Sequence, residues 1–142
     1  IADRIVEATD AATWRIVPEV AYTSEDLNYN NSSSRANREQ NDPSARPAIK
    51  GKCENLADYD VIFLGYPIWW DLAPRIINTF IESHSLKGKT VVPFATSGGS
   101  SIGNSATVLK KTYPDLNWKE GRLLNRTDEK AIRAWFDVVA VK

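Results

Sequence analysis

The sequence contains two related segments, YDVIFLGYPIWWDLAP (residues 59–74) and KTVVPFATSGGSSIGNS (residues 89–105). Each begins with a short apolar run, Val61–Leu64 in the first and Val91–Ala95 in the second. Each run ends in a loop rich in Gly, Pro, Ser or Trp, and a helical pattern follows. Continuous apolar runs are typical of parallel strands buried on both faces. The repeated order of strand, loop and helix predicts an open parallel α/β sheet with a binding crevice at the carboxyl ends of its strands.

Helical periodicity predicts the other elements around these strands. It predicts helices over Ala73–Ser83 and Ser101–Tyr113, and the remaining expected helices are Ile1–Thr9 and Asp128–Phe136, the latter capped by Thr127. The β-branched and aromatic run Thr13–Val17, which Pro18 ends, predicts a short edge strand, and Trp118–Leu124 predicts a weak final strand. Pro93 is unusual inside the second apolar run, because a central strand tolerates a missing N–H only near its end or at a bulge.

The region Glu19–Asn55 is polar, rich in turn-forming residues and without a sustained period. A helical turn is expected within Ser32–Gln40, with a serine as its N-cap. Long loops inside compact domains are uncommon unless they have a function. The region is therefore interpreted either as a surface excursion or as a lid or rim over the crevice.

Composition excludes several classes of protein. The 142 residues carry no net charge, so the basic footprint of a nucleic-acid binder is missing. No apolar run approaches the roughly 18–20 residues of a membrane span. Cys53 is the only cysteine, which excludes a disulfide framework and a thiolate metal cluster and favours a reducing cytoplasm. His84 is the only histidine and follows a predicted helix, so we expect a helix-end or surface role, with no metal site.

The loop after the second apolar run suits an anionic or flat polar ligand. Adjacent Gly98 and Gly99 let the backbone approach a ligand without a Cβ in the way. Successive N–H groups and the start of the next helix then form a donor array. The alternative is an ordinary strand-to-helix turn capped by Ser100 or Ser101.

The loop after the first apolar run contains two adjacent tryptophans. Trp69 and Trp70 either pack into the core, or one of them covers an aromatic ligand. Because side chains alternate along an extended turn, we expect one indole to point inward and the other to face the crevice. An aromatic wall beside a donor array fits a planar heteroaromatic ligand.

The two segments closely resemble a flavodoxin-like group within the flavodoxin family. That group is marked by a YDVIFLGxPIWW segment, here Tyr59–Trp70, and by a GKTVVPFxTxGGS segment, here Gly88–Ser100. The likeness also covers Ala45–Ile49 and extends weakly to Trp135, so it spans most of the chain.

The resemblance implies a flavodoxin-like three-layer fold, a five-stranded parallel sheet in the order 2-1-3-4-5, and FMN bound at the strand ends. It implies that one side of the isoalloxazine is lined by Pro67, Ile68, Trp69 and Trp70. It also implies that the pyrimidine edge of the ring meets Thr96, Ser97, Gly98 and Gly99, largely through backbone groups.

The chain departs from the family at its start. The family's first strand and its Ser/Thr-rich phosphate loop precede the first helix, and Ile1 reads as a position inside that helix. We therefore expect residues 1–142 to form one domain that is incomplete at its N-terminus, with roughly 15–20 further residues upstream. The alternative is a permuted chain in which Val138–Val141 supply the central strand.

A bound flavin would carry the chemistry, so no side chain is needed as a catalytic acid or base. The resulting prediction is an FMN-binding electron carrier that exchanges electrons with redox partner proteins or nucleotides. Two alternatives stay open. One is an oxidoreductase, an FMN-dependent NAD(P)H:quinone-type reductase. The other is a flavodoxin-like module that binds partners without redox chemistry.

Overall fold

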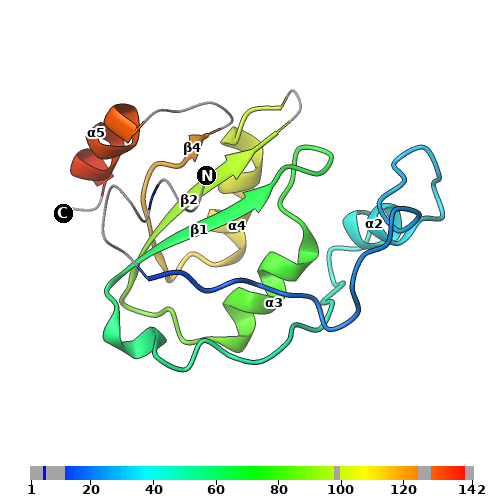
Figure 1. Cartoon of the computed structure of the whole chain (residues 1–142), viewed down its shortest axis with the longest axis horizontal. Helices are drawn as coiled ribbons and strands as arrows, with labels where there is room; N and C mark the ends of the chain where they lie inside the picture. The colour runs from blue at the N-terminus through cyan, green and yellow to red at the C-terminus, as the bar shows by residue number, and fades with distance from the viewer. Residues whose placement is uncertain (1–4, 6–11, 98–99, 125–128, 140–142) are drawn as a thin grey trace.

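A parallel sheet lies at the centre of the computed structural model, which describes residues 5, 12–97, 100–124 and 129–139. Strand β1 (Val61–Pro67) pairs with β2 (Thr90–Thr96), and β2 pairs on its other side with β3 (Asn117–Trp118) and β4 (Arg122–Leu123). The other elements are a 3-10 turn η1 (Leu56–Asp58) and helices α2 (Arg35–Gln40), α3 (Arg75–Ser83), α4 (Gly103–Thr112) and α5 (Glu129–Val139). The predicted open parallel α/β sheet is confirmed (Figure 1).

Side chains alternate between the two faces of the sheet and form two cores. On one face Leu64, Val91 and Ala95 pack against α3 and α4. On the other face Val92 and Phe94 pack against α5 through its buried residues Ile132 and Trp135. Both faces of β1 and β2 are thus covered, which explains why their sequences are apolar throughout rather than alternating.

Pro93 occupies the middle of β2, where the sequence analysis found a proline unusual. The odd-numbered residues of β2 turn their backbone groups toward β3 and β4, since Val91 O accepts from Lys119 N at 2.9 Å and Ala95 O accepts from Leu124 N at 2.8 Å. Pro93 lies between them, where the partner strand is interrupted between β3 and β4. The missing N–H therefore falls at a break in the ladder, in the middle of β2, whereas the sequence led us to expect the end of the strand or a bulge.

The predicted strand over Thr13–Val17 is wrong. The segment carries no strand, and only a single antiparallel bridge joins Pro18 to Ile49. Val17 O accepts from Lys50 N at 2.8 Å, so this backbone pairs with the excursion. A strand needs a neighbour along its length, and the described strands offer none beside this segment. Its β-branched and aromatic composition instead serves packing, because Trp14 and Ile16 lie against the core.

Several boundaries also differ from the predicted ones. Helix α3 begins at Arg75 with Pro74 as its N-cap, and the expected final strand is divided into β3 and β4. Val138 and Val139 belong to α5, so the permuted alternative is wrong for these two residues. Of the expected first helix only Ile5 is described, and it is helical; its other residues and the Thr127 cap lie outside the described residues.

Candidate functional site

The two predicted loops leave the sheet side by side. Pro67 is the register partner of Thr96, and the pairing continues one residue further because Ile68 N donates to Thr96 O at 3.0 Å. The carboxyl ends of β1 and β2 therefore lie at the same edge of the sheet. Ser97 follows directly, whereas Gly98 and Gly99 lie outside the described residues.

The first loop closes in a two-residue hairpin turn, which we call the Trp turn (Trp69–Leu72). Trp69 N donates to Leu72 O at 2.8 Å, and Leu72 N donates back to Trp69 O at 3.1 Å. The central residues Trp70 and Asp71 have φ values of 48° and 65°. Such a turn normally carries Asn-Gly, because the left-handed region is unfavourable for residues with a Cβ. The strain places Trp70 at the tip, where 46% of its surface is exposed.

Trp69 has a different environment from Trp70. It is partly buried, and its ring lies edge-on to Tyr22, with ring centroids 5.6 Å apart and planes at 77°. The two tryptophans therefore differ in burial, while the expectation that one of them faces the crevice stays a prediction. Their contact with a ligand stays a prediction.

The second loop leads into helix α4. The residue at the N-cap of α4 is Ile102, which makes no capping bond with its side chain. Ser101 Oγ accepts from Gly103 N, the first amide of the helix, at 3.4 Å. The alternative of a turn capped by Ser100 or Ser101 is therefore borne out in part, although neither serine is the N-cap residue. Ser97 Oγ accepts from Ser100 N at 2.8 Å, and this bond spans the two glycines. The amino end of α4, which carries the positive end of the helix dipole, follows β2 at the carboxyl edge of the sheet.

Tyr66 connects the end of β1 to α4. Its hydroxyl lies 3.0 Å from Ser105 Oγ, and Ser105 Oγ donates to Ile102 O at 2.9 Å. Burial raises the pKa of the Tyr66 phenol, and the hydrogen bond with Ser105 lowers it in part. The phenol is protonated at neutral pH and donates to Ser105. This link fixes the residue that immediately precedes Pro67.

The polar excursion packs directly against the Trp turn. Helix α2, whose N-cap Ser34 accepts from Asn37 N, carries a buried glutamine at its end. Gln40 Nε2 donates to Trp69 O at 2.9 Å and to Ala73 O at 3.3 Å. In return the buried Arg75 of α3 donates to Glu39 O at 3.1 Å and to Gln40 O at 2.8 Å. Sequence reasoning missed Gln40 and Arg75, because their partners are backbone carbonyls far away in the chain.

Three side chains of the excursion, Tyr22, Arg35 and Glu39, form a cluster that contacts Trp69 through the Tyr22 ring. Arg35 bonds Glu39 with Nε and Oε2 2.9 Å apart, and its guanidinium lies 3.8 Å from the centre of the Tyr22 ring. The Tyr22 hydroxyl donates to the Glu39 carboxylate. Burial, followed by this carboxylate, raises the pKa of Tyr22 far above its usual range. Tyr22 therefore stays protonated at neutral pH and donates to Glu39, while its ring packs against Trp69.

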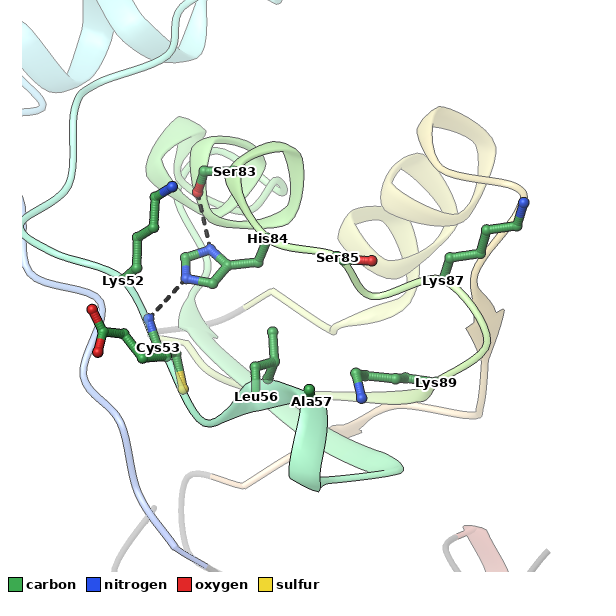
Figure 2. Close-up of a pocket in the computed structure, with 10 residues that line it drawn as sticks. Lys52, Cys53, Leu56, Ala57, Ser83, His84, Ser85, Lys87 and Lys89 are labelled. Atoms are coloured by element: carbon green, nitrogen blue, oxygen red, sulfur yellow. Dashed lines mark hydrogen bonds between the residues drawn. The ribbon is translucent and has the colours of Figure 1, made fainter.

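The opposite edge of the sheet contains a hollow of about 500 Å³. It lies at the amino ends of β1 and β2 and is lined by Lys52, Cys53, Glu54, Leu56, Ala57, Ser83, His84, Ser85, Lys87 and Lys89 (Figure 2). His84 is the C-cap of α3, which confirms its expected role at the end of a helix. Its Nε2 accepts from Cys53 N at 3.0 Å, and its Nδ1 lies 3.0 Å from Phe80 O. Both ring nitrogens are used structurally, so His84 does not act as a base for the Cys53 thiol.

Metal binding finds no support in the part of the chain that the structure describes. Its histidine, cysteine and carboxylate side chains form no group of three or more that could hold a metal ion. Within the same residues, none of the helices has the length and apolar character needed to cross a membrane.

Comparison with known proteins agrees with this geometry. The flavodoxin family model, described as Flavodoxin, matches residues 1–139. This chain belongs to the flavodoxin family. No curated protein matches it.

Solved structures at both high and low sequence identity extend the comparison. A candidate flavoprotein from Bacteroides eggerthii is 74% identical with a TM-score of 0.97, and the match covers 99% of this chain and 89% of that one. Another from Bacteroides uniformis is 48% identical with a TM-score of 0.92, over 96% and 87% of the two chains. A flavoprotein from Lactobacillus acidophilus, solved in complex with FMN, shares 18% identity with a TM-score of 0.68 over 94% and 87%, which shows a common fold.

Proposed function

We propose that this flavodoxin binds FMN at the carboxyl edge of the sheet and acts in electron transfer. The observation that carries the proposal is the Trp turn, which holds the Trp70 indole exposed beside the end of β2. Burying a large aromatic surface is favourable, and its exposure at a strained tip indicates a planar ligand or partner. FMN supplies one- and two-electron chemistry when it is bound.

The residues around this edge fit a flavin ring. Trp70 offers an aromatic face, and Pro67, Ile68 and Trp69 line the same loop. Thr96 and Ser97 lie across from that loop and, together with the N-terminus of α4, provide backbone and hydroxyl donors for the polar edge of the ring. Donors and a positive helix end stabilise negative charge on a reduced ring. In this proposal Gly98 and Gly99 also belong to the donor array.

The first test is the visible absorption of the purified protein, followed by titration with FMN. We expect a yellow protein, or a colourless one that binds FMN with quenching of flavin fluorescence. Protein that stays colourless after FMN addition would contradict both flavin functions and favour the module without redox chemistry. Riboflavin titration in parallel measures how much of the affinity comes from the ring alone.

The second candidate function is an FMN-dependent NAD(P)H:quinone-type reductase. It is favoured by the packing of α2 against the Trp turn, because this contact places the excursion beside the proposed flavin as a rim that a small substrate would meet. Steady-state oxidation of NADPH in the presence of a quinone separates the two functions. A carrier accepts electrons slowly from NADPH alone, whereas a reductase turns over with quinone.

A further inference from the structure

The Trp turn is held in an unfavourable backbone conformation by groups from other elements. Two consecutive residues with a Cβ, Trp70 and Asp71, adopt left-handed φ values. That region is unfavourable for residues with a Cβ. Such a turn persists only where its surroundings determine it. The two bonds between Trp69 and Leu72 close the hairpin and leave the orientation of its tip to other contacts.

Two amide side chains from different helices bond to the turn. Gln40 of α2 donates to Trp69 O at 2.9 Å, one residue before Trp70. Asn104 in the first turn of α4 donates to Asp71 O at 3.0 Å, one residue after Trp70. Together they bond the carbonyls on either side of Trp70. The peptide before Trp70 and the peptide after Asp71 are therefore held by two elements far apart in the sequence.

Gln40 is poorly explained as a residue that serves stability alone. It is 6% exposed, and its Oε1 finds no hydrogen-bond partner among the described residues. Its amide orientation is set by two carbonyl neighbours, since the flipped amide would turn Oε1 toward two oxygens. A buried acceptor without a partner is costly, and an apolar side chain of similar size would avoid that cost. What the amide adds is direction, through its donation to the carbonyl that precedes Trp70.

We propose that Gln40 and Asn104 are positioning residues that hold the Trp turn and thereby set how Trp70 meets the bound ring. The inference rests on the proposed function for its effect on FMN. Its effect on the turn itself is independent of FMN. Neither residue touches the flavin in this proposal, so their substitution acts only through the turn.

The test compares Gln40→Leu, Asn104→Ala and Asp71→Gly, singly and combined. Glycine favours the left-handed φ of position 71 and keeps the backbone carbonyl that Asn104 bonds. If the amides act by holding a strained turn, relaxing the strain reduces the need for them. We expect Gln40→Leu to weaken FMN binding about tenfold and Asn104→Ala about threefold, on the scale of one net hydrogen bond. Adding Asp71→Gly should bring Gln40→Leu to within about threefold of the Asp71→Gly protein and should bring Asn104→Ala to the same affinity as that protein.

Hydrogen exchange in the flavin-free protein provides the readout that a merely structural role would not move. Gln40→Leu should speed exchange of the Trp69 and Leu72 amides, while the amides of β2 keep their rates. The matched control is Asn117→Ala, which removes an amide side chain bonded to Thr90 Oγ1 at 3.1 Å at the other end of the sheet. The control should leave both the two amides and the FMN affinity unchanged.

The outcomes separate this inference from the proposed function. If wild-type protein fails to bind FMN, the proposed function is wrong, and the exchange measurement still decides the role of the two amides. If FMN binds and Gln40→Leu changes neither exchange nor affinity, the positioning role is wrong. A Gln40→Leu defect that Asp71→Gly does not rescue also overturns it, because the strain would then not be what Gln40 opposes.

Discussion

The two edges of the sheet differ, because one contains a hollow and the other contains a strained turn. The amino edge has the hollow of about 500 Å³, yet His84 at its wall already uses both ring nitrogens to cap α3 and to hold the Cys53 backbone. The carboxyl edge has the Trp turn, with two left-handed residues and an indole exposed over 46% of its surface. The edge that stores strain and exposes an aromatic ring is the better candidate for function, even though the hollow lies at the other edge.

Packing beneath the carboxyl edge gives the largest expected effect. A Cβ on Gly65 would lie 2.3 Å from Phe94 Cζ, so Gly65→Val should destabilise the protein by about 3 kcal/mol. Urea unfolding followed by tryptophan fluorescence measures this loss. The control at the amino edge is Gly88→Ala, where φ is 81° and nothing lies within 4 Å of the added Cβ. It should cost only about 1 kcal/mol, from the backbone alone. Equal losses at the two glycines would remove the proposed difference in packing.

Loss of the exposed indole sharpens the functional side of the comparison. Trp70→Ala should weaken FMN binding by about 1–3 kcal/mol, the usual scale for a stacked aromatic partner, and leave unfolding almost unchanged. Trp69→Ala should weaken binding to a similar extent, and it should also destabilise the fold because Trp69 packs against Tyr22. Flavin titration together with urea unfolding separates the two. Unchanged affinity in both variants would end the stacking role of this loop.

The amino edge should respond in the opposite way. His84→Ala removes the C-cap of α3, the acceptor for Cys53 N and a ring stacked on Phe80 with centroids 4.4 Å apart. We expect a loss of about 1–2 kcal/mol in unfolding free energy and an unchanged FMN affinity. Isothermal titration beside thermal unfolding makes the comparison. Weaker flavin binding in this variant, at equal fraction folded, would show that the two edges are coupled.

The smallest expected effect is on pH dependence. The hydrogen bond from Tyr113, together with Arg46, lowers the pKa of Glu82 from its ordinary value of 4.5. A lowered pKa in the folded state contributes stability that is present above 4.5 and is lost as pH falls through the folded value. Glu82→Gln should therefore flatten the acid side of the stability profile by less than about 1 kcal/mol, since this side chain is 44% exposed. Unfolding series between neutral and acid pH test this, and a parallel profile for the variant would contradict it.

Sequence patterns predicted the elements that depend on local order. Val61–Leu64 and Val91–Ala95 are continuous apolar runs, and both became buried parallel strands. The Trp and Ser-Gly loops were predicted at one edge because parallel strands end together, and Pro67 and Thr96 do lie in register. Thr13–Val17 shows the limit of this approach, because β propensity cannot supply a neighbouring strand.

Longer-range polar contacts escaped prediction. Gln40 and Arg75 bond backbone carbonyls rather than side chains, so no pairing of charges or motifs marks them in the sequence. The left-handed backbone at Trp70 and Asp71 also has no sequence signal, since that turn normally selects Asn and Gly. A weak signal for the excursion was its length, because long ordered loops are uncommon without a function.

Pro93 has a consequence for the geometry of the whole carboxyl edge. A slip of β2 by one residue against its outer neighbours would turn the proline ring away from the gap between β3 and β4 and leave a donor missing where the ladder needs one. The imino acid therefore admits a single alignment of these strands. That alignment places Phe94 and Ala95 beside Arg122 and Leu123, so a residue buried in mid-sheet sets where the Ser97 turn stands relative to the outer strands.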